Sequence, residues 1–177
     1  MVVVWIDAIT CPYSIKNQNL LEMIKTGEKI TTSFELKVVR NGEEKTVQFS
    51  ELLDRPTIVS VYMKNNTGSC DKQNSSLVAD QEKFADKGVN LIAISKDTCG
   101  SHKKYAEKHG INYILASDPE LYFSKATDSI VEKQMYGKSY EGPSRSAFYI
   151  DTDGTVLGII EKIDPKNHAS ELLELIS

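Results

Sequence analysis

Cys70 is the residue best placed to do chemistry, because a polar turn follows a strand-like run that ends at Met63, and helical periodicity begins after the cysteine. The first-turn N–H groups and the dipole of a helix favour an anion, so a thiolate is stabilised at this position. Thr67, three residues earlier, can direct its hydroxyl toward the same place. The two residues therefore predict a nucleophilic sulfur beside a hydroxyl.

A structural role fits the same two residues. A cysteine also serves as a small buried hydrophobic residue, and a threonine before a helix is a common N-cap. The spacing from Thr67 to Cys70 alone leaves both interpretations open.

Two further cysteines, Cys11 and Cys99, make the total odd and widely spaced. Such a pattern does not form the disulfide framework of a small secreted protein, and it favours free thiols in a reducing, cytoplasmic compartment. Cys99 and His102 have a metal-ligand spacing but amount to half a zinc site, so we expect no metal. We expect His102 and His109 to be solvated on a lysine-rich helix face.

Alternating and continuous apolar runs predict the elements that position these residues. Asn41-Gly42 and Asp153-Gly154 each indicate a tight hairpin. Strands are predicted over 34–39, 46–49, 57–63, 89–94, 114–116, 146–150 and 156–160. Helices are predicted from Cys70 to Gly88 and over 101–108, 119–126 and 168–176, with a capped turn over 50–54.

This order of elements predicts an α/β fold with a mixed central sheet and helices on both faces. In such sheets, sites lie beyond the carboxyl ends of the parallel strands. That rule selects the segments after Met63 and after Ser95, and each of them carries a cysteine.

The 177 residues fit one ordinary domain, and no repeat or linker divides them. We expect the domain over 26–177 and an N-terminal extension over 1–25, with a strand over 2–6 and a short helix over 18–25. The apolar start is too short for a signal peptide or a membrane span. The interspersed charges, with a net charge of −4, favour neither nucleic acid nor a membrane as partner.

The segment Val59–Cys70 resembles the active-site segment of peroxiredoxins, whose pattern is P-x-x-x-T-x-x-C after a strand; Thr67 and Cys70 match it. Further stretches look like the bacterioferritin-comigratory (Q-type) branch of these AhpC/TSA-like proteins. They cover residues 93–97, 101–110, 115–119, 135–140 and 145–151.

The resemblance implies a thioredoxin-like fold and the reduction of hydrogen peroxide or organic hydroperoxides without a cofactor. It assigns Cys70 as the peroxidatic cysteine, Thr67 as the residue that bonds the peroxide, and Arg145 as the cation beside the thiolate. A guanidinium there would also stabilise the oxygen on which charge develops. A thioredoxin-like or other thiol reductant and a monomer or homodimer are further implications.

Two positions depart from the family pattern. Met63 stands where the pattern has proline, and Ser75 stands where many members of this branch carry a resolving cysteine. Cys99 follows the next parallel strand, so both thiols would emerge at one rim of the sheet. Resolution by Cys99, by an outside thiol or by Cys11 stays open.

Two other functions compete with a peroxidase. A thioredoxin-like disulfide reductase needs a second cysteine at position 67 or 73, where the chain has Thr67 and Gln73. A degenerate redox sensor or binding module without turnover stays open because of the departures at Met63 and Ser75.

Overall fold

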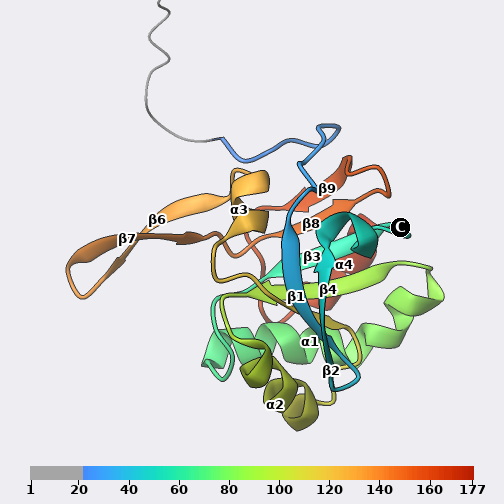
Figure 1. The fold of residues 1–177 in the computed structure, drawn as a ribbon, viewed down its shortest axis with the longest axis horizontal. Helices are drawn as coiled ribbons and strands as arrows, with labels where there is room; N and C mark the ends of the chain where they lie inside the picture. Colours follow the sequence, from blue (N-terminus) through green and yellow to red (C-terminus); the bar gives the residue numbers. More distant parts are fainter. Residues whose placement is uncertain (1–21) are drawn as a thin grey trace, which may run out of the picture.

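The computed structural model describes residues 22–177, which form a seven-stranded mixed sheet with helices on both faces (Figure 1). The strand order is β2-β1-β5-β4-β3-β8-β9. Its strands are β1 (Glu35–Arg40), β2 (Glu43–Gln48), β3 (Thr57–Val61), β4 (Asn90–Ser95), β5 (Ile114–Ser117), β8 (Ala147–Ile150) and β9 (Val156–Ile160).

The parallel strands lie in the centre of the sheet. β3 pairs with β4 and β4 with β5, both in parallel, and β8 pairs antiparallel with the other edge of β3. Every side chain of β3 is buried, as its continuous apolar run predicts. Both predicted hairpins are confirmed, and Asn41 (φ 52°) and Gly42 (φ 78°) supply the positive φ angles that the first one needs.

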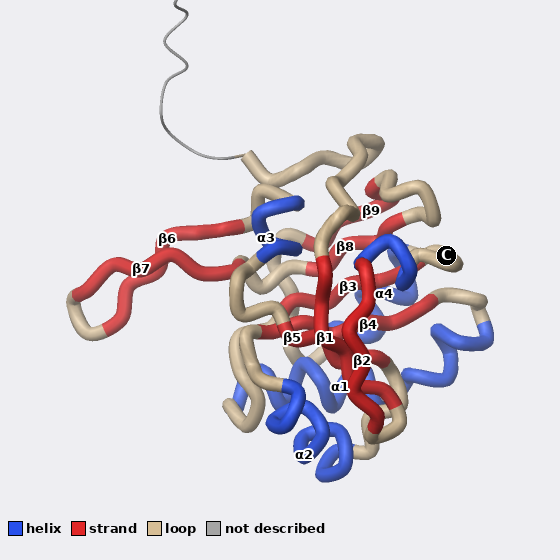
Figure 2. The backbone as a smooth tube through the Cα atoms, viewed as in Figure 1, coloured by secondary structure: helices blue, strands red, loops and turns tan. Residues whose placement is uncertain are grey.

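The helices form two unequal layers (Figure 2). One face of the sheet packs against α1 (Gly68–Asp86), α2 (Cys99–His109) and α4 (His168–Leu175), with Leu77, Phe84 and Leu172 among its buried residues. The other face is covered by the 3₁₀ helix η1 (Phe49–Leu52) and α3 (Tyr122–Ala126), whose Phe49 and Phe123 rings pack together.

A hairpin that the sequence did not predict projects from the domain (Figure 1). It consists of β6 (Ile130–Met135) and β7 (Lys138–Pro143), which pair with each other and, within 22–177, with no other strand. We call residues 130–143 the arm. Polar and exposed residues occupy both of its faces, so the alternation that marks a core-facing strand is missing.

Two predicted helices begin or end elsewhere. α3 starts at Tyr122 rather than at Pro119, because the carboxylate of Asp118 accepts the N–H groups of Tyr122 and Phe123 and so sets the first turn. Residues 22–25 carry no helix, and Ile24 N–H donates to Thr127 O. The rest of the helix predicted over 18–25, the strand predicted over 2–6 and Cys11 lie outside the described residues.

No helix within 22–177 is both long and apolar enough to cross a membrane.

Candidate active site

Cys70 occupies the first turn of α1, as predicted, where the chain leaves the carboxyl end of β3. Thr67 is the N-cap, and the first intrahelical hydrogen bond runs from Asp71 N to Thr67 O at 2.8 Å. The amides of Gly68 and Cys70 precede that bond, so their N–H groups belong to the unpaired first turn. The Cys70 side chain is 1% exposed. The thiol is therefore shielded from bulk water and lies at the end of the helix that favours an anion.

Arg145 reaches the thiol from the segment between β7 and β8. Its Nη2 lies 3.4 Å from Cys70 Sγ and 2.9 Å from Ser69 Oγ, which it also uses as an acceptor. A guanidinium keeps its charge at every physiological pH, so this contact stabilises a thiolate. Residues 75 positions apart thus meet at one sulfur atom.

Thr67 does not cap the helix with its side chain, unlike the structural interpretation of this residue. Its Oγ1 donates to Lys64 O at 2.9 Å. Because that bond uses the hydroxyl proton, the oxygen keeps its lone pairs and can accept a further hydrogen bond.

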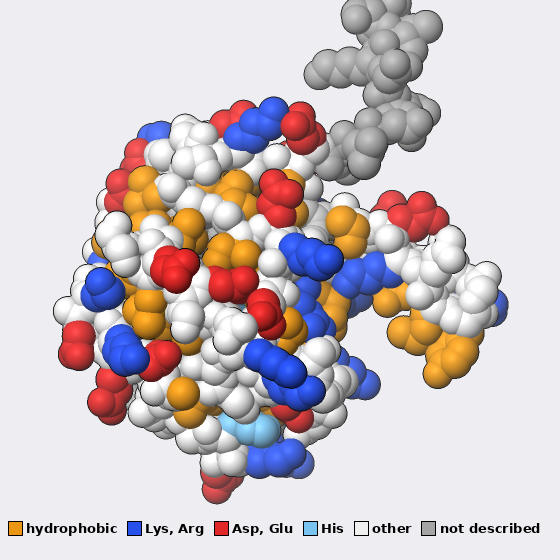
Figure 3. Space-filling model, turned by 180° about the vertical axis from the view of Figure 1, so that it is seen from behind, with side chains coloured by type: hydrophobic (Ala, Val, Ile, Leu, Met, Phe, Trp, Pro, Cys, Tyr) orange, Lys and Arg blue, Asp and Glu red, His pale blue; other side chains and the backbone are white. Residues whose placement is uncertain are grey.

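A second cation comes from the middle of the arm, and sequence reasoning missed it. Lys133 Nζ lies 2.6 Å from Met63 Sδ, on the residue that replaces the family proline. Burial lowers the pKa of Lys133, the nearby Arg145 lowers it further, and Cys70 acts in the opposite direction. Figure 3 shows lysine and arginine side chains gathered where the arm meets the domain. Arg145 and Lys133 are therefore two cations whose charges act near the thiol.

A buried polar network holds the first turns of α1. Tyr105 on α2 donates to Asp71 Oδ1 at 2.8 Å, and Asn74 Nδ2 donates to Cys70 O at 3.2 Å and to Tyr105 Oη at 3.4 Å. Burial, followed by Asp71, raises the pKa of Tyr105, so this phenol stays a donor. The network fixes the backbone on which the thiol is carried.

His102 belongs to a second part of this network, and our expectation that it is solvated is wrong. It is fully buried, and its Nε2 bonds Ala116 O at 3.2 Å. Its Nδ1 lies 3.3 Å from Asn65 Nδ2 and from Tyr62 Oη. Burial lowers its pKa, so the neutral ring accepts at Nδ1. His102 faces inward because it shares the Tyr105 face of α2, and His109 is partly buried with its ring 4.4 Å from that of Tyr105.

Cys99 lies at the first residue of α2, after the carboxyl end of β4. Its side chain is 6% exposed, and burial raises its pKa, with Glu44 adding to the effect. It borders a cleft of about 750 Å³ whose other walls come from β1, β2 and the start of α3. Cys70 and Cys99 are both free thiols. Within the described residues, no three His, Cys, Asp or Glu side chains form a cluster that could hold a metal ion.

Comparisons with known proteins identify the family of the chain. The model of the AhpC/TSA family matches residues 27–159. Peroxiredoxin Bcp of Bacillus subtilis is 29% identical over 153 residues, which cover 86% of this chain and 95% of that protein.

Solved structures give the same result. Peroxiredoxin Q of Xanthomonas campestris superposes with a TM-score of 0.73 at 25% identity, covering 81% of this chain and 89% of that one. Peroxidoxin BcpB of Mycobacterium tuberculosis superposes with a TM-score of 0.71 at 27% identity, covering 86% and 96%. The thioredoxin-like fold predicted from the sequence is thereby confirmed, and the chain belongs to the AhpC/TSA family as a peroxiredoxin.

Proposed function

We propose that this peroxiredoxin reduces hydrogen peroxide or organic hydroperoxides at Cys70, with Thr67 and Arg145 as the groups that bind the peroxide. The observation that carries the proposal is the 3.4 Å approach of Arg145 Nη2 to Cys70 Sγ at the start of α1. A thiolate beside a fixed cation and unpaired amides is the arrangement that an activated sulfur nucleophile requires.

The reaction follows from the donors and acceptors of the site. The peroxide O–H donates to Thr67 Oγ1, whose own proton is held by Lys64 O. The thiolate then attacks that oxygen, the O–O bond breaks, and the sulfur becomes a sulfenic acid while the other oxygen leaves as water or an alcohol after taking a proton. Arg145 stabilises the negative charge as it moves from sulfur to the leaving oxygen.

The sulfenic acid must then be reduced by a second thiol. Cys99 is the intramolecular candidate in the described chain because β3 and β4 are neighbouring parallel strands, so both cysteines follow the same rim of the sheet. Its raised pKa leaves little thiolate near neutral pH, which slows its attack. We therefore propose an outside thiol, such as a thioredoxin-like protein, as the competing route; Cys11 is the third alternative.

Other parts of the proposal rest on the sequence. We propose a cytoplasmic, reducing location because Cys70 and Cys99 are free thiols in a chain without a disulfide framework. We propose that residues 26–177 form the catalytic domain, that the enzyme is a monomer or homodimer, and that neither nucleic acid nor a membrane is its partner.

The first experiment maps the oxidised sulfur atoms. The reduced protein receives one equivalent of hydrogen peroxide with a sulfenic-acid trap present, and the cysteine peptides are quantified by mass spectrometry. We expect Cys70 to be consumed selectively and much faster than Cys99 or Cys11. A Cys99→Ser variant separates the resolving routes, because it abolishes a Cys70–Cys99 disulfide and leaves a trapped sulfenic acid.

Turnover with a thiol reductant separates the enzyme from a redox sensor or binding module without turnover. If Cys70 reacts no faster than the other two thiols, Cys70 is not the peroxidatic residue. If it reacts fast but no reductant restores it, the sensor is the better account.

A further inference from the structure

Met63 carries a second sulfur atom next to the cluster that contains Cys70. It lies two residues after the end of β3, is partly buried, and packs against the core cluster that contains Cys70. A thioether is polarizable and accepts an oxygen atom from peroxides. A peroxide that enters the site therefore meets two oxidisable side chains, Cys70 and Met63.

Lys133 gives this methionine an unusual partner. Its Nζ lies 2.6 Å from Met63 Sδ, and in the described part of the chain this is the only hydrogen bond of the ammonium, which pairs there with no carboxylate. A thioether is a weak acceptor. A partly buried ammonium that donates to such a weak acceptor is stabilised little by that hydrogen bond. A stronger oxygen acceptor at the same place would stabilise the ammonium more.

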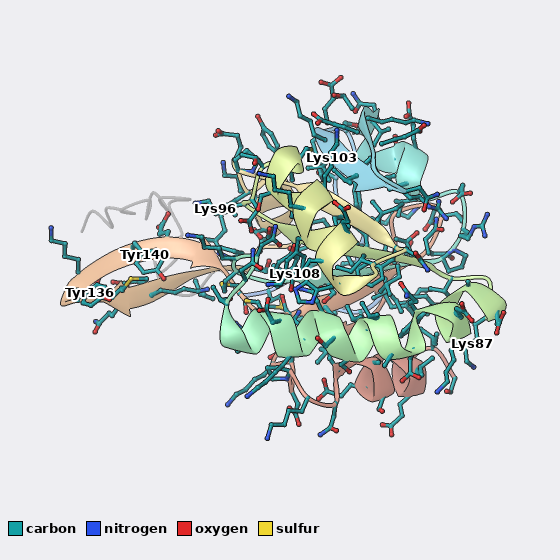
Figure 4. All side chains as sticks on the ribbon, turned by 90° about the horizontal axis from the view of Figure 1, so that it is seen from below. Lys87, Lys96, Lys103, Lys108, Tyr136 and Tyr140 are labelled. Carbon is teal, nitrogen blue, oxygen red and sulfur yellow. The ribbon has the colours of Figure 1, made fainter. Side chains whose placement is uncertain are left out.

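The arm holds Lys133 in this position. Lys133 pairs with Tyr140 in the β6–β7 register, and its Cδ lies 3.6 Å from where a Cβ on Gly142 would stand. Figure 4 shows Tyr136 and Tyr140 along the arm, which leads away from the helices. The ammonium is thus presented to Met63 by a paired strand and not by a free loop.

We propose that Met63 is a site of peroxide oxidation, at which the sulfoxide oxygen accepts the hydrogen bond of Lys133. Met63 Sδ attacks one peroxide oxygen and the O–O bond breaks. The leaving oxygen takes a proton from Lys133, and the transferred oxygen returns its own proton to that amine. The thioether is oxidised to the sulfoxide, and the peroxide is reduced to water or an alcohol.

Proton donation to the leaving oxygen makes Met63 more reactive than its exposure implies. The same chain supplies a matched control in Met135, which lies on the arm and is 54% exposed. Met135 reacts with peroxide by simple access. A rate that favours the less exposed methionine is therefore the signature of the proposed site.

The test uses full-length protein with the Cys70→Ser substitution, so that the thiolate does not consume the oxidant. Hydrogen peroxide is added in excess, and peptide mass spectrometry follows the gain of one oxygen at Met63 and at Met135. We expect Met63 to react at least about tenfold faster than Met135. A methionine sulfoxide reductase should remove the added oxygen, which identifies the sulfoxide.

Two variants of Lys133 test the partner. Lys133→Leu should slow Met63 oxidation about tenfold, Lys133→Arg should slow it less, and Met135 should react alike in all three proteins. Met63 oxidation at or below the Met135 rate overturns the proposal, and so does a Lys133→Leu variant with an unchanged rate. The proposal rests on peroxide reaching the Cys70 site. In the protein with Cys70 intact, slow Cys70 oxidation would reject that site. Fast Cys70 oxidation there, together with slow Met63 oxidation in the Cys70→Ser protein, would reject only the role of Met63.

Discussion

Replacing His168 with glutamine should remove a large part of the acid sensitivity of the fold. His168 begins α4 and is fully buried, with Nε2 2.8 Å from Ser60 Oγ on β3. Ser60 Oγ also accepts from Gln73 Nε2 at 3.0 Å. The other ring nitrogen, Nδ1, lies 3.7 Å from Glu171 Oε2 and has no hydrogen-bond partner in the described residues.

The magnitude follows from the pKa of this ring. Burial lowers the pKa of His168 to about 3, against about 6.5 in the unfolded chain. The neutral ring is thus a requirement of the folded state. The contribution of the neutral His168 ring to the free energy of unfolding is complete above about pH 6.5. It is lost as the pH falls toward 3, because His168 in the unfolded chain is protonated at a higher pH than in the folded one. Between pH 6.5 and pH 5, which are 1.5 pH units apart, the free energy of unfolding falls by about 1.4 kcal/mol per unit, or about 2 kcal/mol in all.

Urea unfolding at pH 7 and pH 5 measures this loss. The free energy of unfolding of the unsubstituted protein should fall by about 2 kcal/mol more than that of His168→Gln between the two values. His102, whose pKa burial also lowers, is present in both proteins and cancels. Equal losses in the two proteins would refute the reasoning and would mean that Glu171 or water compensates the charged ring.

Three further predictions concern the site. Arg145→Met should slow the oxidation of Cys70 by about 10²–10³-fold in rapid-mixing assays, and Arg145→Lys should recover part of that rate if charge beside the sulfur is what matters. Thr67→Val should slow the oxidation of Cys70, whereas Thr67→Ser should leave its rate unchanged, because only the hydroxyl oxygen is needed. Equal rates in the two variants would remove Thr67 from the mechanism. Tyr105→Phe should lower the free energy of unfolding by about 1.5–3 kcal/mol, measured in urea, because the hydrogen bond to the charged Asp71 is lost.

The elements that bury apolar residues could be predicted from the sequence. β3 and β4 are continuous apolar runs, and hydrophobic burial decides their place regardless of what surrounds them. The Asn41-Gly42 turn was readable because few residues adopt two consecutive positive φ angles. Cys70 could be placed at the start of a helix from its local sequence. Its contact with Arg145 was predicted from the family resemblance and not from the spacing of residues.

The arm and its lysine could not be predicted in this way. Tyr136 has a φ of 51° and is 97% exposed, so neither a core-facing pattern nor a usual turn pair marks the hairpin. Lys133 looks like any surface lysine in the sequence, and only the tertiary path of β6 brings it to Met63. His102 was wrongly predicted to be solvated. Its lysine neighbours lie on the outer face of α2, whereas His102 itself lies on the inner face.

The network beneath the thiol also bears on how the sulfenic acid is reduced. A disulfide needs the two Cα atoms within about 7 Å, which for Cys70 and Cys99 we expect to require unwinding of the first turn of α1. Two hydrogen bonds stabilise that turn, from Tyr105 to Asp71 and from Asn74 to Cys70 O. Loss of each bond costs about 1–3 kcal/mol. An outside thiol avoids this cost if it can reach Cys70 Sγ from the solvent side. The same bonds that hold the thiol ready for peroxide therefore oppose its internal resolution, and Tyr105→Phe should increase the yield of the Cys70–Cys99 disulfide if that route is used at all.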